Sequence, residues 1–272
     1  MTTSKAWTLS PIWATNPSEE AMAELIYAHC ALRATARPTV TDRWPRMPSG
    51  GTPRPLAIGS RLWLLVSAVP ATEYEEGLAA RLSDVEWLAQ CGVAHHDVMA
   101  RAARTHVVAP FRLLTLFRSE ERAIEEATRL RTKIERALDR VNDRREWVVR
   151  VAAVPGATTS PRTRARSGTS YLMARAPQPR VVATATPGAR RAARELVAEL
   201  KAYADQIVTR PSEAAHVLYD GALLVSRKKE VDIGNVVRQW KPRLAPVGCR
   251  VSLTGPWPPY SFVSLHGRRS DH

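Results

Sequence analysis

The chain has 272 residues, of which 44% are hydrophobic, and carries a formal net charge of +14 at pH 7. This length and apolar content suffice for two ordinary hydrophobic cores, and no stretch approaches the roughly 20 apolar residues of a membrane-spanning helix. The cysteines Cys30, Cys91 and Cys249 lie far apart without zinc-ligand spacing, so the sequence predicts a soluble, cytoplasmic protein without a disulfide framework or structural metal.

Residues 1–60 give the least defined pattern. The apolar residues 7–14 are compatible with a first strand, and residues 16–20 are typical of a helix start with Ser18 as the N-cap. Met22, Leu25 and Ile26 would then form the apolar stripe of this helix. Residues 37–55 are rich in proline and glycine and therefore predict an extended loop.

A strand and two helices are predicted next. Residues 61–69 are large and apolar, which predicts a buried strand. Apolar residues then recur at helical spacing from Leu78 to Leu88, and we expect Gly92 to end or kink this helix before a second helix over 93–105.

A second strand and a long helix complete the first half. Residues 106–117 predict a strand with Phe111, Leu113, Thr115 and Phe117 on one face. Ser119 is a predicted N-cap, and the helix that follows has acids in its first turn and a supporting pair, Glu125 with Arg129. An alternating strand lies at 147–151. This order of elements predicts an α/β domain over 1–156, most economically a ferredoxin-like variant.

Positive charge is concentrated between residues 157 and 194. This segment has no acidic residue and contains eight arginines, Arg162, Arg164, Arg166, Arg175, Arg180, Arg190, Arg191 and Arg194. We interpret residues 157–194 as an arginine-rich linker. Alternatively, such a segment can contact the phosphates of nucleic acid. However, its arginines are not interleaved with aromatic residues, and the sequence contains no base-reading motif.

The rest of the chain predicts a second α/β domain with helical elements over 195–272. A helix would carry Leu196, Leu200, Tyr203 and Ile207 in register, and residues 214–227 would form a strand or hairpin. Asp232 would cap another helix before a final strand at 249–255.

Motifs of catalysis are missing from the sequence. It contains no phosphate-cradling glycine motif, nucleophile elbow or HExxH pair. The adjacent His95 and His96, with Asp97, would point about 100° apart on a helix, which suits a metal poorly. The sequence therefore predicts a protein that is not an enzyme and has no metal or cofactor.

Two segments are candidates for binding a partner. Residues 109–112 place a proline and an arginine in a predicted strand, which indicates either an edge strand with a snorkelling or paired arginine, or an edge where another strand docks. Residues 254–262 hold two aromatic rings between three prolines, either against the core or as a preorganised recognition patch. The candidate partner-binding residues are Pro110, Phe111, Arg112, Leu114, Trp257, Pro258 and Tyr260.

The segment GPWPPYSFV, residues 255–263, resembles the closing motif of the GvpL/GvpF family of gas vesicle proteins. Residues 82–115 and 119–151 resemble two further blocks of that family in order and spacing, and Gly168 with Tyr171 and Leu172 resembles a shorter one. The resemblance covers roughly residues 60–265.

The resemblance implies a two-domain accessory protein of gas vesicle assembly, located at the gas vesicle in the cytoplasm. It would bind the hydrophobic shell protein, or other accessory gas vesicle proteins, during nucleation and growth. Because a hydrophobic shell subunit is prone to aggregation before it is incorporated, a protein that covers its strand edges makes physical sense. The edge at 110–117 would hold the shell subunit, and the turn at Trp257 and Tyr260 would lock the domains or complete the surface. The alternative is a nucleic-acid-binding module acting through residues 157–194.

Overall fold

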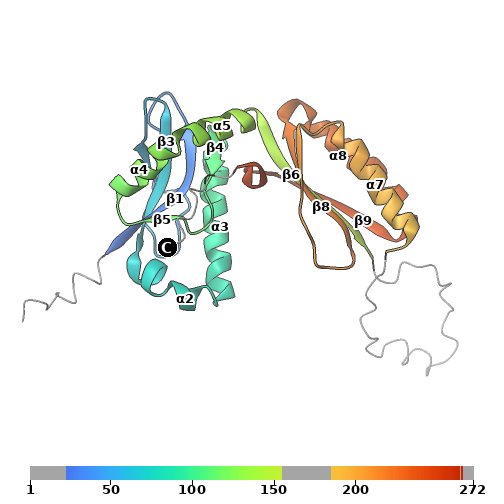
Figure 1. Ribbon diagram of the computed structural model, residues 1–272, viewed down its shortest axis with the longest axis horizontal. Helices are drawn as coiled ribbons and strands as arrows, with labels where there is room; N and C mark the ends of the chain where they lie inside the picture. The colour runs from blue at the N-terminus through green and yellow to red at the C-terminus, as the bar shows by residue number, and fades with distance from the viewer. Residues whose placement is uncertain (1–22, 155–184, 264, 266–272) are drawn as a thin grey trace, which may run out of the picture. The chain divides into compact units, whose positions relative to one another are not determined.

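The structure is a computed structural model that describes residues 23–154, 185–263 and 265. Contacts divide the chain into two units, one holding the residues up to 101 with 111–129, the other holding 102–110 with the chain from 130 onward. Helices and antiparallel strands occur in both halves (Figure 1). The expected fold class, mixed helix and sheet in two domains, is therefore confirmed. The predicted first strand at 7–14 and the capping residue Ser18 lie outside the described residues.

The first sheet has the strand order β2-β3-β1-β4, and β5 pairs with β1. Its strands are β1 (Glu24–Arg33), β2 (Arg54–Ala57), β3 (Leu62–Pro70), β4 (Val107–Pro110) and β5 (Leu116–Phe117). The strand predicted at 61–69 is confirmed as β3, but the predicted helix with Leu25 and Ile26 is wrong, because both residues lie in β1. This strand is buried along almost its whole length, so its sequence lacks the alternation that distinguishes a strand from a helix.

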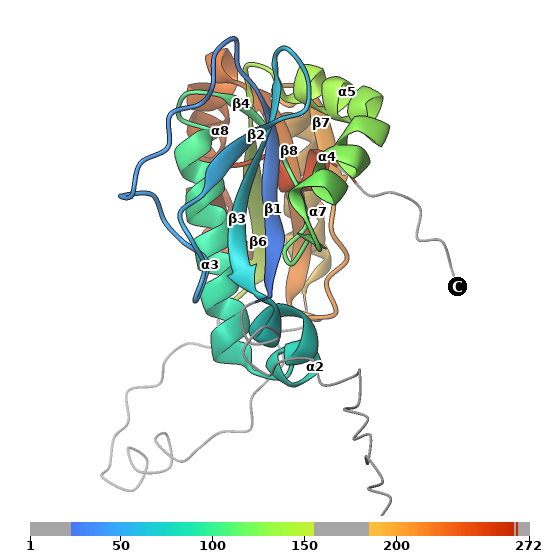
Figure 2. The same ribbon diagram turned by 90° about the vertical axis from the view of Figure 1, so that its left-hand side faces the viewer.

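The helical segments of this half of the chain are drawn in Figure 2. They are the π-helical turn η1 (Thr72–Glu76), α2 (Leu78–Arg81), α3 (Val85–Ala102), α4 (Glu120–Arg129) and α5 (Arg131–Val141). Helix α3 runs through Gly92, which was expected to end or kink it. The interruption between helices comes earlier, between α2 and α3. There Asp84 caps α3 by accepting hydrogen bonds from the N–H groups of Glu86 and Trp87, both at 3.0 Å.

The cap predicted at Ser119 is confirmed, since its hydroxyl accepts a hydrogen bond from the N–H of Arg122 at 3.3 Å. The long helix that it starts is divided at Leu130 into α4 and α5. Arg129 pairs with Glu126 at 2.7 Å rather than with Glu125. Spacings of three and four residues both bring side chains together on a helix, so sequence alone does not choose between the two acids.

The second sheet has the strand order β7-β8-β6-β9. Its strands are β6 (Arg144–Ala153), β7 (Gln206–Thr209), β8 (Val217–Ser226) and β9 (Cys249–Trp257). Strand β6 was expected to complete the N-terminal half, but it pairs with β8 and β9. Its alternating sequence predicts a strand and contains nothing that selects its partners. Ile207, predicted in a helix, lies in β7.

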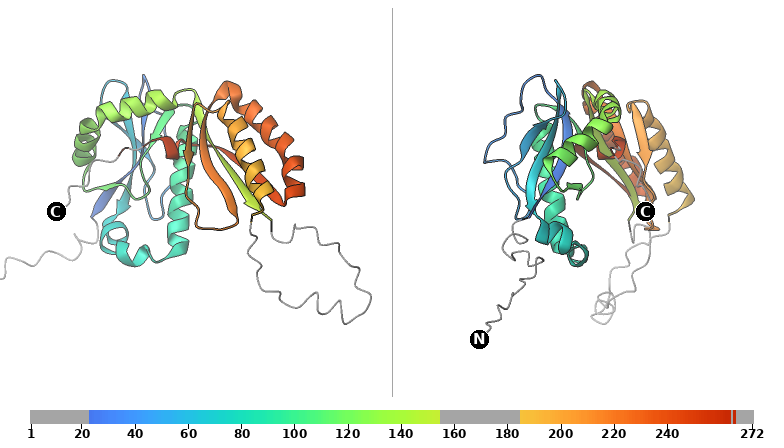
Figure 3. Two further views of the ribbon diagram at one scale, coloured as in Figure 1. Left: turned by 45° about the vertical axis from the view of Figure 1, so that its right-hand side comes forward. Right: turned by 60° about the vertical axis from the view of Figure 1, so that its left-hand side comes forward.

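Two helices, α7 (Pro187–Lys201) and α8 (Glu230–Leu244), lie side by side over one face of this sheet (Figure 3). The described residues also form the short turns η2 (Arg227–Lys229), η3 (Ala245–Val247) and η4 (Tyr260–Phe262). Thr186 caps α7 by accepting a hydrogen bond from the N–H of Ala189 at 3.1 Å. Asp232, the expected cap of α8, lies instead in the first helical turn.

The core of this unit follows from strand alternation and helical spacing. Alternate residues of the central strands, among them Val149, Val151 and Leu223, face Leu196 of α7 and Trp240 of α8. The indole N–H of Trp240 donates to Glu199 at 2.7 Å, which satisfies the one polar group of that ring. None of the described helices is long and apolar enough to cross a membrane.

Gly221 in β8 leaves room for a neighbouring ring. A Cβ atom at this position would lie 2.9 Å from Cε1 of Tyr219 and closer still to its hydroxyl. The tyrosine therefore occupies the space where a side chain of residue 221 would stand.

We expect Gly221→Ala to lower the free energy of unfolding by about 1–3 kcal/mol, because the ring of Tyr219 must leave its position. Urea unfolding of the full chain measures this cost. The same substitution in a Tyr219→Ala background should cost much less, since the two residues are in contact. Equal costs in both backgrounds would contradict the assignment.

Candidate functional site

The segment predicted as one strand at 106–117 is two short strands joined by a turn. In this turn the N–H and the hydroxyl of Thr115 donate to the carbonyl oxygen of Arg112, at 3.2 Å and 2.8 Å. Leu114 has a φ of 62°, a left-handed conformation that costs a residue with a side chain about 1 kcal/mol or more. The single-strand prediction is wrong, because the sequence gives no sign of a left-handed leucine.

The four candidate binding residues of this segment differ in exposure. Strand β4 ends the strand order of its sheet, as its proline predicts. However, Pro110 and Phe111 are buried and Leu114 is half-buried, which leaves Arg112 as the candidate here that is exposed. Leu113 beside it is also exposed, at 39%.

A buried polar network holds this turn. The N–H of Leu114 donates to the hydroxyl of Tyr27 at 3.3 Å, and this hydroxyl is hydrogen-bonded to Nδ1 of His95 at 2.8 Å. His29 lies against His95 with 5.8 Å between ring centroids, and its Nε2 bonds to the hydroxyl of Ser67 at 2.9 Å. The network links β1, α3, β3 and the turn.

Both histidines of the network are held neutral. Burial lowers the pKa of His95 from 6.5 to about 4, with His96 acting in the same direction. Burial also lowers the pKa of His29 well below its usual value, and the neighbouring His95 adds to this effect. Burial raises the pKa of Tyr27, which keeps its hydroxyl protonated.

Protonation of these histidines must favour the unfolded chain, because their pKa values are lower in the folded protein. Their contribution is fully present above pH about 6.5 and is lost as the pH falls toward about 4. We expect His95→Gln, which retains an acceptor for Tyr27, to reduce this acid-induced loss of stability. Urea unfolding between pH 7.5 and 4 measures it, with the exposed His216→Gln as the matched control. An unchanged pH dependence in His95→Gln would contradict the assignment.

The second candidate segment begins with a bulge in β9. Glu146 and Val148 of β6 oppose Trp257 and Thr254, so β9 carries one additional residue between these pairs. Gly255 lies in the bulge with a φ of 137°, and the Gly255–Pro256 peptide bond is cis. A Cβ atom on residue 255 would approach the carbonyl oxygen of Glu146 to 2.9 Å, so glycine is required at this position.

Glu146 ties the turn η4 to β6. Its carboxylate is only 2% exposed and accepts two hydrogen bonds from Ser261, one from the N–H and one from the hydroxyl, each at 2.8 Å. Arg140 of α5 donates to the carbonyl oxygen of Phe262 at 3.1 Å. Burial raises the pKa of Glu146, and the two bonds from Ser261 oppose that rise.

The aromatic residues of this segment lie at the surface of the turn. Trp257 and Tyr260 are each 36% exposed, whereas Pro258 is buried. The indole N–H of Trp257 donates to the hydroxyl of Thr254 at 3.3 Å. The candidate residues are divided between the two units that the contacts define. Pro110 and residues 257–260 belong to one unit, and residues 111–114 belong to the other.

We expect Glu146→Ala to lower the free energy of unfolding by about 1–3 kcal/mol, because it leaves two donors of Ser261 without their acceptor. Glu146→Gln retains one acceptor oxygen and should cost less. Ser261→Ala removes one bond and should also cost less than Glu146→Ala. Thermal unfolding of the full chain measures this graded series. If all three variants were as stable as the wild type, the tether would contribute nothing to the free energy of unfolding.

Metal ligands do not converge within the described part of the chain: no three His, Cys, Asp or Glu side chains there are placed to hold a metal ion. His95 is instead committed to Tyr27, as described above. The arginine-rich segment is only partly described. Its first five arginines lie outside the described residues, whereas Arg190, Arg191 and Arg194 lie on α7.

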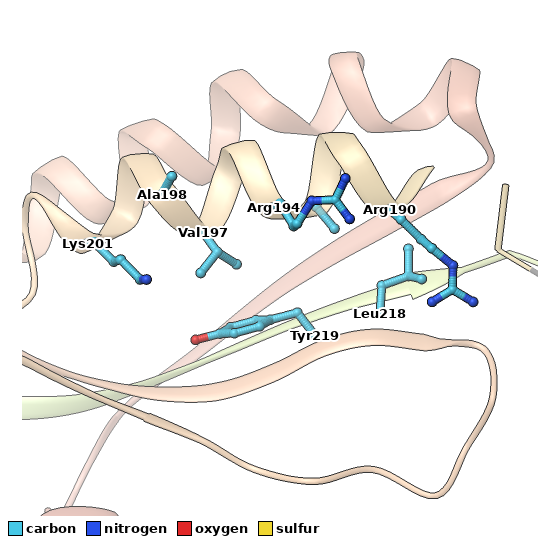
Figure 4. Close-up of a pocket in the computed structure, with 8 residues that line it drawn as sticks. Arg190, Arg194, Val197, Ala198, Lys201, Leu218 and Tyr219 are labelled. Carbon is cyan, nitrogen blue, oxygen red and sulfur yellow. The ribbon is translucent and has the colours of Figure 1, made fainter. Parts of the chain in front are cut away.

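Sequence reasoning missed a groove between α7 and β8. It has a volume of about 450 Å³ and is lined by Arg190, Ala193, Arg194, Val197, Ala198, Lys201, Leu218 and Tyr219 (Figure 4). The cations recur at helical spacing on α7, and this pattern could have indicated a basic helix face. The strand residues that form the floor could not be paired with that face before the fold was known.

Comparisons with known proteins agree on one family. Residues 25–264 match the model of the gas vesicle synthesis protein GvpL/GvpF family. The chain is 34% identical to gas vesicle protein L of Streptomyces sp. (strain CB03234), over 79% of this chain and 85% of that protein.

Two crystal structures share the fold at low sequence identity. One is the gas vesicle protein GvpF from Anabaena sp. PCC7120, with 14% identity, a TM-score of 0.63 and coverage of 92% of this chain and 100% of that one. The other is GvpF from Microcystis aeruginosa, with 11% identity, a TM-score of 0.58 and coverage of 88% and 98%. On the family match and the identity to gas vesicle protein L, this chain belongs to the GvpL/GvpF family of gas vesicle proteins.

Proposed function

We propose that this protein is a non-catalytic accessory protein of gas vesicle assembly that binds the hydrophobic shell protein, or another accessory gas vesicle protein, during nucleation and growth. It would act in the cytoplasm and at the gas vesicle. Family membership supports the gas vesicle role. The observation that carries the binding proposal is the end of β9, where an edge strand runs into two exposed aromatic rings.

The outer edge of β9 suits an extended partner. This strand ends the order β7-β8-β6-β9, so within the described sheet only its inner edge is paired. An exposed edge can receive a further strand through main-chain hydrogen bonds, while side-chain contacts give specificity. A hydrophobic shell subunit that has not yet been incorporated offers such strands, and covering them would prevent premature aggregation.

The two aromatic rings would supply the anchoring contacts. Trp257 and Tyr260 are the residue types that contribute most at protein interfaces. The bulge at Gly255 and the tether from Glu146 to Ser261 fix the backbone around them. A partner therefore meets rings that are already positioned, which reduces the entropy lost on binding. Arg112, on the exposed turn of the other unit, is a second candidate contact.

We expect the double variant Trp257→Ala/Tyr260→Ala to lose most of its capture of the shell protein, because two such anchors together contribute about 2 kcal/mol or more. The measurement is a nuclease-treated pull-down of co-expressed major shell protein by the purified full chain at low and high salt. Wild-type capture should survive high salt, since the contact is apolar. Arg112→Ala is tested in parallel.

The matched control is Val231→Ser, which changes an apolar side chain that is 71% exposed on α8. Thermal unfolding verifies that each variant is folded. Undiminished capture by the folded double variant would exclude the β9 end as the binding surface. Retention of nucleic acid at low salt only, without shell protein, would favour the nucleic-acid-binding alternative.

A further inference from the structure

The groove between α7 and β8 presents a continuous stripe of one helix. Positions 190, 194, 197 and 201 follow one another at spacings of three or four residues, and position 198 lies four after 194 and three before 201, so the five share one face of α7. The stripe extends over about 16 Å of helix axis at 1.5 Å per residue. Two arginines stand at its N-terminal end, Val197 and Ala198 follow, and Lys201 closes the other end (Figure 4).

Within the part of the chain that the structure describes, the positive charge of this stripe has no acidic counterpart. No acidic residue lines the groove. Among the ion pairs between described residues, none involves Arg190, Arg194 or Lys201, whereas the adjacent Arg191 pairs with Glu195 at 2.8 Å. Arg190, Arg194 and Lys201 are all exposed. The groove therefore has the charge of a site for an anionic partner.

The floor of the groove is apolar. It consists of Leu218 and the ring of Tyr219, which extends along β8 beneath Val197 because Gly221 leaves it space (Figure 4). The volume of about 450 Å³ is in the range of protein binding sites. A ligand that fills the groove must therefore place apolar groups in the middle and anionic groups near both ends.

We propose that this groove binds an acidic peptide segment of another protein, with carboxylates near both ends and apolar side chains between them. A helix of about eleven residues, or a shorter extended segment, matches the length of the stripe. This surface is separate from the end of β9, so the proposal goes beyond the binding of a shell protein strand and does not depend on it.

The pattern of the groove favours a peptide over nucleic acid. A nucleic acid strand carries a phosphate at every nucleotide, and its binding sites combine tracks of cations with several stacked aromatic rings. Here Val197 and Ala198 interrupt the cations, and Tyr219 is the one aromatic residue of the lining. A carboxylate also forms a bidentate pair with arginine, which suits Arg190 and Arg194.

The probe is a fluorescein-labelled peptide of about eleven residues with two glutamates at each end and alanines and leucines between, titrated against the full chain by fluorescence anisotropy. We expect binding that weakens with salt. The triple variant Arg190→Gln/Arg194→Gln/Lys201→Gln should bind about tenfold more weakly or worse, since each exposed ion pair contributes a factor of about two to five. The control Arg191→Gln, on the same helix but outside the groove lining, should bind normally.

Charge reversal gives a test that a general loss of stability cannot imitate. The variant Arg190→Glu/Arg194→Glu/Lys201→Glu should lose the acidic peptide and bind the peptide in which lysines replace the glutamates. A third peptide, in which glutamines replace the glutamates, should bind neither the wild type nor the charge-reversed variant.

Three outcomes would overturn the proposal: no binding of the acidic peptide to the wild type, equal binding to the triple glutamine variant, or tighter binding of oligothymidylate that depends on the same three cations. The last outcome would assign the groove to nucleic acid. Because the probe is a synthetic peptide, failure here leaves the shell protein pull-down unaffected, and failure of the pull-down leaves this result unaffected.

Discussion

The buried carboxylate of Glu146 fixes the turn η4 on the second sheet. A carboxylate that is 2% exposed is costly unless its oxygens are paired, and both oxygens here accept bonds from Ser261. This tether positions the turn that contains Trp257 and Tyr260. The bulge at Gly255 lies directly beside it, since the carbonyl oxygen that excludes a side chain from residue 255 is that of Glu146 itself.

A comparable arrangement supports the turn at Leu114. There the polar partners are neutral, because burial keeps His29 and His95 unprotonated and Tyr27 protonated. The left-handed leucine is unfavourable by itself, and the bond from its N–H to Tyr27 offsets part of that cost. In both units, then, a buried polar group determines the shape of an exposed turn. Such groups specify one conformation more strongly than apolar packing does, because a partly paired alternative is penalised.

The sequence predicts those elements whose local pattern decides their structure. Strand β3, the cap at Ser119 and the mixed fold class follow from apolar runs, capping chemistry and element order. The helix predicted over β1 fails because a strand buried on both faces has no alternation. The partners of β6 fail for another reason, since pairing is decided by residues more than fifty positions later in the chain. The gas vesicle family was identifiable because residues 255–263 combine a rare order of glycine, prolines and aromatics.

Among the candidate binding residues, too, some features could be predicted from local sequence and others could not. Trp257 and Tyr260 are exposed, and the prolines around them explain why the segment could be selected from sequence. The burial of Pro110 and Phe111 could not be foreseen, because an apolar residue in an edge strand has the same sequence signature whether it faces the core or a partner. The groove on α7 required the fold, since Leu218 and Tyr219 come from a different element than its cations.

The two proposed surfaces of the second unit differ in the physical basis of their affinity. At the end of β9 the energy would come from aromatic burial and main-chain hydrogen bonds, which salt affects little. Along α7 it would come from exposed ion pairs, which are weak one by one and screened at physiological ionic strength. A partner that engaged both surfaces would combine a salt-resistant anchor with a salt-sensitive contact, and the second contact would benefit from the effective concentration that the first one creates. One bivalent partner would therefore lose affinity when either surface is altered, whereas two independent partners would each respond to changes in one surface only.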